Sequence, residues 1–253
     1  MFKTQKYGWV RDLPDHRDHK YTAVEPFATL PKKVDLRPQC PPVYDQGQIG
    51  SCTANSLAGL IQFDELKEKV SKPFIPSRLF IYYNERVLEY SVKSDSGAQL
   101  RDGIKALVKW GCAPESEWPY VESKFATKPT KAVYKDALKV QIQQYQSIPQ
   151  NEQSLKSCLA SGFPVVFGFS VYESFESDEV AKTGVVPLPT QDEQMVGGHA
   201  VCCVGYDDAE RVFIVRNSWG PDWGLKGYFL FPYAYMLSPD LSSDFWTIRF
   251  VKE

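Results

Sequence analysis

The stretch that decides the fold reads Asp45-Gln46-Gly47-Gln48-Ile49-Gly50-Ser51-Cys52-Thr53, a glycine-rich turn that leads into a cysteine. Behind Cys52 the apolar residues fall at i, i+3, i+4 and i+7, namely Ala54, Leu57, Ala58 and Ile61. This spacing predicts an amphipathic helix whose first turn carries Cys52. A helix N-terminus presents unpaired N–H groups and a partial positive charge, so this placement favours a thiolate over a thiol.

Two later segments, Gly198-His199-Ala200 and Asn217-Ser218-Trp219-Gly220, supply an imidazole and an amide. A thiol is a weak nucleophile until a base takes its proton, and imidazole titrates in the right range. His199 is therefore the predicted base, and Asn217 is predicted to orient its ring by accepting the ring N–H. Gln46 is predicted to donate to the oxyanion of a tetrahedral intermediate, beside the Cys52 backbone N–H.

The order Gln, Cys, His and Asn, with Asn-Ser-Trp-Gly around the last, resembles the papain-like (C1-type) cysteine proteases. The resemblance extends over residues 34–253 and includes Val34-Asp35-Leu36-Arg37 and Trp118-Pro119-Tyr120. Three positions depart from the family pattern. Thr53 replaces an aromatic residue, Ile49 replaces a cysteine that would be half of a disulfide, and Gly198 replaces an Asp or Asn.

The resemblance also implies substrate-binding residues. Gly97 and Ala98 match a glycine-bearing stretch that pairs its backbone with an extended substrate, although Gly97 could instead be a helix-entry glycine. Gly198 and Ala200 flank the predicted base, and Ala200 is expected to line the pocket for the substrate residue two before the scissile bond. Trp219 is expected to shield the hydrogen bond between the imidazole and the amide from water, the alternative being a simple packing residue.

The chain is expected to fold into two lobes. Helices are predicted over 76–90 and 97–110, and short β-branched and aromatic runs predict strands over 164–171, 200–206, 211–217, 227–231 and 245–250. The fold class is therefore α+β, papain-like, with a helical lobe over about 34–139 and an antiparallel, β-barrel-like lobe over about 140–253. The active site is expected in the cleft between them.

Composition excludes several classes of protein. The 253 residues are 43% hydrophobic with a formal net charge of −2, which argues against a nucleic-acid partner. Without a signal peptide or an apolar run of membrane length, we expect no membrane partner and a location that is cytoplasmic or reached by non-classical export. A catalytic Cys52 leaves five of the six cysteines, which cannot all pair, and a reducing compartment is favoured.

Residues 1–33 are polar, charged and proline-containing and are predicted to form an extended arm. The arm is shorter than the helical propeptide usual in the family, and we expect it either to cover the cleft in cis as a regulator or to pack on the strand-rich lobe. Its His16 and His19 have a spacing that occurs in metal sites, but nothing completes a site, so no metal or other cofactor is expected.

The function expected from these residues is a monomeric cysteine peptidase that cleaves a peptide or protein substrate through a thioester acyl-enzyme. Two alternatives stay open at this point. One is a catalytically idle, peptide-binding or inhibitory homologue. The other is an aminopeptidase or transpeptidase activity on the same scaffold.

Overall fold

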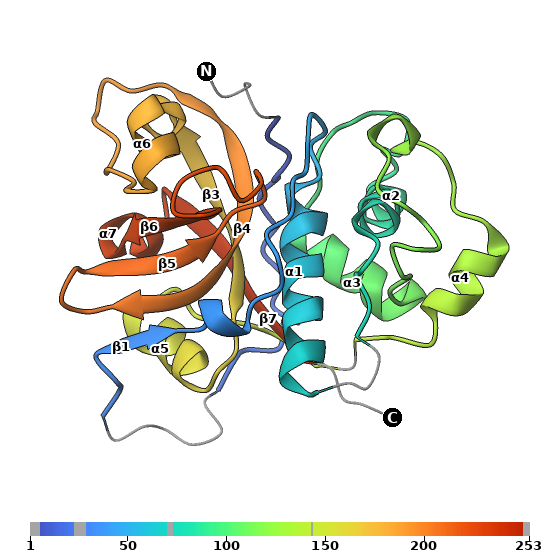
Figure 1. Ribbon diagram of the computed structural model, residues 1–253, viewed down its shortest axis with the longest axis horizontal. Helices are drawn as coiled ribbons and strands as arrows, with labels where there is room; N and C mark the ends of the chain where they lie inside the picture. The colour runs from blue at the N-terminus through green and yellow to red at the C-terminus, as the bar shows by residue number, and fades with distance from the viewer. Residues whose placement is uncertain (1–5, 23–28, 70–72, 143, 250–253) are drawn as a thin grey trace.

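The computed structural model describes residues 6–22, 29–69, 73–142 and 144–249. Figure 1 shows two lobes side by side, a sheet on one side and helices on the other, with a long helix running between them. The helices of the first half are α1 (Cys52–Lys67), α2 (Arg78–Leu88), α3 (Leu100–Trp110) and α4 (Lys131–Ala137). The sheet lobe adds α5 (Glu152–Ala160), α6 (Asp178–Thr183) and α7 (Tyr233–Leu237).

The sheet has seven antiparallel strands in the order β2-β7-β3-β4-β5-β6, with β1 paired to β4 off this path. Its strands are β1 (Lys33–Asp35), β2 (Gln144–Ser147), β3 (Val165–Tyr172), β4 (Met195–Asp207), β5 (Val212–Arg216), β6 (Tyr228–Pro232) and β7 (Ser242–Arg249). The outer strands of the path, β2 and β6, do not pair with each other among the described residues, so the expected barrel is an open sheet. The mixed α+β class is confirmed.

Helix α1 is not the amphipathic helix that the spacing predicted. Fourteen of its sixteen residues, Cys52 through Glu65, are buried. The physical reason is that α1 packs against α2 and α3 on one side and against β3, β4 and β7 on the other. A helix with both sides covered has no solvent-facing stripe, so its polar residues are buried as well.

The boundaries of α2 and α3 follow from local chemistry. The Ser77 side chain accepts a hydrogen bond from Phe80 N–H and so caps the first turn of α2 (3.1 Å). Gly111 ends α3 at φ 75°, a left-handed conformation that favours glycine. Both helices were predicted, and both lie within the predicted ranges.

Two strands of the sheet, β1 and β2, were not predicted from the sequence. β1 comes from the part of the chain that we expected in the helical lobe, but it pairs with β4 through Lys33 to Asp35. β2, which pairs with β7, was not predicted at all. Both strands are short, three and four residues, and neither shows the alternating apolar pattern from which strands are recognised.

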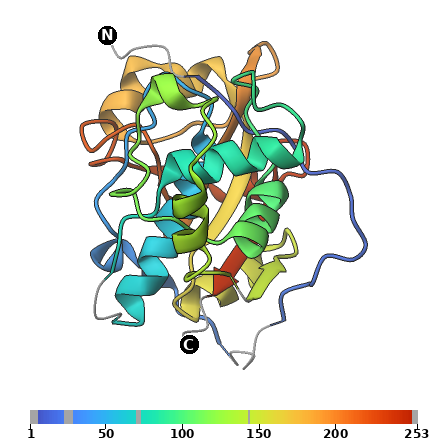
Figure 2. The ribbon, with the colours of Figure 1, turned by 90° about the vertical axis from the view of Figure 1, so that its right-hand side faces the viewer.

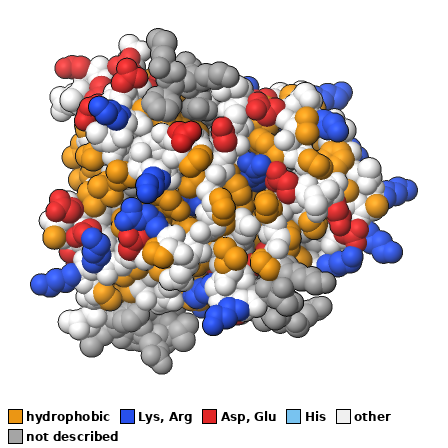
Figure 3. Space-filling view, viewed as in Figure 1, with side chains coloured by type: hydrophobic (Ala, Val, Ile, Leu, Met, Phe, Trp, Pro, Cys, Tyr) orange, Lys and Arg blue, Asp and Glu red, His pale blue; other side chains and the backbone are white. Residues whose placement is uncertain are grey.

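Before β1, the described residues of the N-terminal arm form no helix and no regular strand. Near its start it passes between the lobes, where Trp9 forms a parallel bridge with Ala98, and further on Lys20 bridges Ser147 of β2. Figure 2 shows this dark blue segment following one flank of the molecule. The face in Figure 3 carries acidic, basic and hydrophobic side chains interspersed.

Candidate active site

Cys52 is the first residue of α1 and is fully buried. The preceding turn is held to the sheet lobe, because Gln46 N–H donates to the Ser218 carbonyl (2.9 Å). It is held to the helical lobe as well, because Gly50 N–H donates to Asp95 Oδ1 (2.9 Å). The thiol therefore sits at the junction of the two lobes, on the N-terminal end of a helix.

His199 lies on β4 and is fully buried. Its Nε2 donates to Asn217 Oδ1 (2.8 Å), which also accepts Ser218 N–H (2.8 Å) and so presents its oxygen to the ring. Trp219 stacks on the imidazole, with ring centroids 4.9 Å apart and planes at 26°. The other ring nitrogen, Nδ1, has no hydrogen-bond partner among the described residues. The ring is thus oriented by Asn217 and covered by Trp219.

The structure brings the predicted nucleophile to the strand that carries the predicted base. The backbone N–H of Ala200, the residue after His199, lies at the Cys52 thiol and acts to lower its pKa. Burial outweighs this effect and raises the pKa of Cys52 to about 12. Burial likewise lowers the pKa of His199 to about 4, against the opposing effect of its bond to Asn217. In this closed structure burial therefore favours a neutral thiol and a neutral imidazole. This differs from the expectation from sequence, in which the helix N-terminus favoured a thiolate.

Gln46 has both ends of its side-chain amide engaged. Its Oε1 accepts a hydrogen bond from Ser218 Oγ (2.7 Å), which fixes the amide orientation. Its Nε2 donates to the carbonyls of Ile49 (3.2 Å) and of Lys6 in the arm (3.1 Å). The predicted oxyanion donor thus already binds a peptide carbonyl of the chain's own arm.

The arm crosses the thiol at Gly8. The Gly8 backbone N–H lies at the sulfur of Cys52. A Cβ on Gly8 would lie 1.8 Å from the Gly50 carbonyl oxygen, so only glycine fits this crossing. Ala98 N–H donates to the Gly8 carbonyl (2.7 Å), and Val10 N–H donates to the Ala98 carbonyl (3.0 Å). The arm is held on the helical lobe by backbone pairing.

Residues predicted to bind substrate contact this arm. Gly97 has φ 74°, and a Cβ there would lie 2.0 Å from the Gly8 carbonyl oxygen. The Gly198 carbonyl accepts Trp9 N–H (2.9 Å). Trp219 lies near Tyr7, with ring centroids 6.1 Å apart, while Ala200 lies against the thiol.

Two contacting groups were not predicted as site residues. Tyr7 and Trp9 place aromatic rings on either side of Gly8, and this aromatic-glycine-aromatic run in a charged arm was an available signal. Asp244, which accepts the Trp9 indole N–H (3.0 Å), left no such signal, because only the pairing of β7 with β3 brings it near.

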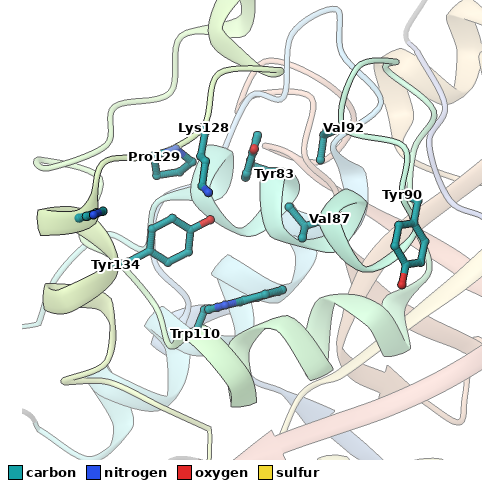
Figure 4. Close-up of a pocket in the computed structure, with 9 residues that line it drawn as sticks. Tyr83, Val87, Tyr90, Val92, Trp110, Lys128, Pro129 and Tyr134 are labelled. Atoms are coloured by element: carbon teal, nitrogen blue, oxygen red, sulfur yellow. The ribbon is translucent and has the colours of Figure 1, made fainter.

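A cavity of about 710 Å³ lies in the helical lobe, apart from this site. Figure 4 shows its aromatic lining, with Tyr83 on α2, Trp110 on α3 and Tyr134 on α4 facing one another. None of the predicted site residues lines it.

Within the described ranges no three His, Cys, Asp or Glu side chains are grouped as metal ligands would be. No helix in these ranges has the length and apolar character needed to span a membrane.

Comparison with known proteins places this site in a family. The family model described as papain family cysteine protease matches residues 30–236. The chain is 43% identical, over 275 residues, to an uncharacterized peptidase C1-like protein of Acanthamoeba polyphaga mimivirus, covering 99% of this chain and 88% of that protein. It is 30% identical to cysteine proteinase 2 of Entamoeba histolytica, over 78% of this chain and 62% of the relative's length.

Solved structures agree with these matches. The crystal structure of xylellain, a cysteine protease from Xylella fastidiosa, superimposes with a TM-score of 0.93 at 49% identity, covering 97% of this chain and 96% of that one. The digestive procathepsin L 3 of the Tenebrio molitor larval midgut has a TM-score of 0.72 at 20% identity, which shows the shared fold. The chain therefore belongs to the papain family of cysteine proteases and is a cysteine peptidase.

Proposed function

We propose that this peptidase cleaves its substrate through a thioester on Cys52. The thiolate attacks the peptide carbonyl, and His199 then protonates the leaving amine. Water hydrolyses the thioester with His199 as base. Asn217 holds the imidazole through the Nε2 bond, which leaves Nδ1 for the thiol. Gln46 Nε2 and the Cys52 backbone N–H stabilise the oxyanion in both steps.

The observation that carries this proposal is the peptide already lying in the site. The arm places an extended backbone across Cys52, pairs it with Ala98 on both sides of Trp9, and sets a carbonyl on Gln46 Nε2. These are the contacts that a peptidase needs with an extended substrate. A site that accommodates its own chain in this way supports a peptide or protein substrate.

We propose further that the arm is a regulator in cis and that its direction protects it from cleavage. The leaving amine of a substrate must lie beside His199, and in a substrate that amine belongs to the C-terminal part. In the arm the residue beside His199 is Tyr7, with ring centroids 5.9 Å apart, and Tyr7 is N-terminal to Gly8. The arm thus runs opposite to a cleavable peptide, so no arm carbonyl is presented with its amine next to the imidazole.

Hydrolysis of a blocked peptidyl-coumarin by four full-length proteins tests both statements. Gly8→Val should expel the arm through the clash with Gly50 and raise the initial rate about 5- to 100-fold over wild type, since overpacking of this kind costs about 1–3 kcal/mol. Leu13→Ala is the matched control, because that arm side chain is 71% exposed. The double variant Gly8→Val/Cys52→Ala should show no hydrolysis.

The same proteins separate the peptidase from its idle alternative. A Gly8→Val protein that is alkylated at Cys52 but hydrolyses no peptide would mean that the cleft binds without turnover. Equal rates for wild type and Gly8→Val, in a protein that hydrolyses the peptide well, would remove the arm as a regulator while leaving the peptidase in place.

A further inference from the structure

A buried carboxyl group lies against the first turn of α1. Glu85, on α2, is fully buried, and its Oε2 accepts the hydroxyl of Thr53, the residue after the nucleophile (2.8 Å). Its other oxygen, Oε1, has no hydrogen-bond partner among the described residues. An ionised carboxylate needs several donors to replace its water, so a carboxyl group with a single donor is better suited to the neutral, protonated form.

Glu85 is not paired with the cation beside it in the chain. The guanidinium of Arg86 donates instead to four backbone carbonyls, at 2.6 to 3.2 Å. The negative charges of Glu89 on the same helix and of Asp102 on α3 oppose the ionisation of Glu85, whereas the charge of Arg86 favours it. Burial is the largest effect, and it raises the pKa of Glu85 to about 8. Glu85 is therefore a neutral acid at acidic and neutral pH.

The packing of the helices leaves room for this side chain. A Cβ on Gly103 of α3 would lie 2.5 Å from Glu85 Oε1 and 2.4 Å from Cδ1 of Leu57 on α1. Gly103 lies inside a regular helix, where glycine is less favourable than alanine. The missing side chain at Gly103 thus admits the carboxyl group to the place where α1, α2 and α3 meet.

Thr53 connects the carboxyl group to the nucleophile. The backbone N–H of Thr53 lies at the Cys52 sulfur and acts to lower the pKa of the thiol, whereas a negative charge on Glu85 acts to raise it. The neutral form of Glu85 holds the Thr53 side chain without opposing the thiolate. The ionised form would place a negative charge beside the positive end of α1 and draw water into a dry contact between helices. Ionisation of Glu85 should therefore make the thiolate less stable.

We propose that Glu85 is a positioning residue for the reaction at Cys52: as a neutral acid it holds the first turn of α1 through Thr53, and its ionisation sets the alkaline limit of activity. This proposal rests on the proposed peptidase function. The contacts of Glu85 with Thr53 and with Gly103 are made between helices and do not involve the arm. They therefore persist when Gly8→Val displaces the arm.

The test is the pH dependence of kcat/KM for a blocked peptidyl-coumarin, measured with full-length enzymes in the Gly8→Val background from about pH 5 to about pH 10. Glu85→Gln keeps the shape of the neutral acid and cannot ionise. The midpoint of the alkaline loss of activity should therefore move up by about 1 pH unit, at the lower end of what a nearby charge does. Glu68→Gln is the matched control, because it removes a carboxylate from the exposed, opposite end of α1 and should leave this midpoint where it is.

Two substitutions at Thr53 test the hydrogen bond in the same background. Thr53→Val removes the hydroxyl and keeps the shape, so kcat/KM at about pH 6 should fall about 2- to 10-fold, the size of one hydrogen bond. Thr53→Ser keeps the donor and should restore most of this loss. Because the bond from Thr53 acts to lower the pKa of Glu85, Thr53→Val should also move the alkaline midpoint up. This second shift decides the question where Glu85→Gln fails to fold.

The possible outcomes are distinct. An alkaline midpoint that Glu85→Gln leaves unchanged or lowers, or a Thr53→Val enzyme that equals its parent at every pH, overturns the positioning role while the peptidase function stands. A well-folded Gly8→Val enzyme whose Cys52 is alkylated but that hydrolyses no peptide overturns the peptidase mechanism, and the positioning role falls with it. Where Gly8→Val fails to fold, Gly8→Ala carries the same clash with one methyl group.

Discussion

Cys52 and His199 are both fully buried, and burial disfavours the charged form of each. The pKa of the thiol rises to about 12 and that of the imidazole falls to about 4, so the pair is neutral at intermediate pH while the arm is in place. Water that enters when the arm leaves would stabilise both charged forms, and the helix N-terminus would then favour the thiolate. The reactivity of Cys52 is thus coupled to the position of the arm.

Removal of the base should cost far more than removal of the residue that orients it. In the Gly8→Val background, His199→Ala is expected to lower kcat about 10⁴-fold or more, because nucleophile and base act as one unit. Asn217→Ala should cost less, since water can partly replace an orienting acceptor. Steady-state hydrolysis measures both, with circular dichroism as the check on folding. Equal losses would mean that Asn217 does more than orient the ring.

Gln46 should affect turnover and arm closure separately. In the Gly8→Val background, Gln46→Ala is expected to lower kcat about 10²- to 10³-fold, because the amide acts on the oxyanion of the transition state. In the wild-type background the same change removes the hydrogen bond to the Lys6 carbonyl (3.1 Å), so alkylation of Cys52 should become faster. An unchanged kcat in the first background would exclude Gln46 from the oxyanion hole.

At the scale of elements, the arm fits against the strands and loops that it crosses because glycines there leave room for it. Gly97 and Gly168 each face the arm so closely that a Cβ would lie about 2 Å from it. A single methyl group at either position would act on the whole segment, because the arm's backbone pairing with Ala98 and its indole contact with β3 are made at adjacent residues.

Gly168→Val should therefore open the enzyme from the sheet side. The added side chain would overlap the Trp9 indole, a conflict that typically costs about 1–3 kcal/mol, so the labelling of Cys52 is expected to speed up about 5- to 100-fold. The probe is a peptidyl epoxide with alanine in the position that Trp9 fills. A small side chain is needed there because the Gly168→Val side chain also narrows the space under the Trp9 indole. In the Trp9→Ala background the same substitution should add little, as expected for a pair in contact. Additive effects would show that the valine acts elsewhere.

The predictability of the elements depended on whether the deciding contacts were local. α2 and α3 were predictable, because Ser77 and Gly111 mark their ends in the sequence. The surroundings of α1 were not, because a spacing pattern shows which residues are apolar and not how many neighbours cover the helix. The open sheet, β1 and β2 depend on pairing between distant segments. The prediction of Gln46, Cys52, His199 and Asn217 as catalytic residues rests on the recognisable order in which they occur.

At the scale of the whole molecule, closure of the arm is linked to pH through a pair of carboxyl groups. Burial raises the pKa of Asp12 from 3.8 to about 7, with the negative charge of Asp244 as the next cause. An acid whose pKa is raised in the closed state binds more protons there than in the open state. Closure should accordingly be most stable at low pH and weaken as pH rises from about 4 to about 7.

This linkage can be measured by the ratio of two labelling rates at Cys52, one with a bulky peptidyl inhibitor and one with a small alkylating agent. The ratio should rise from pH 4 to pH 7 in wild type, because the bulky probe needs the whole arm to leave the cleft, whereas the small one needs only a local opening at Gly8. Asp12→Asn should flatten the rise, and Leu13→Ala should keep it. A wild-type ratio that falls over this range would reverse the sign and refute the linkage.

The bridge between Trp9 and Ala98 joins two parts of one chain, so the closed fraction should not depend on the protein concentration. A blocking segment attached to the chain it blocks has an effective concentration in the millimolar range, which does not change when the protein is diluted. Closure should therefore be independent of enzyme concentration, and the specific activity of wild type should stay constant over a wide dilution series. A free substrate meets only the open fraction, so its apparent affinity is weakened by that fraction. A slow gain of activity on dilution would instead indicate that the segment in the cleft comes from a second molecule.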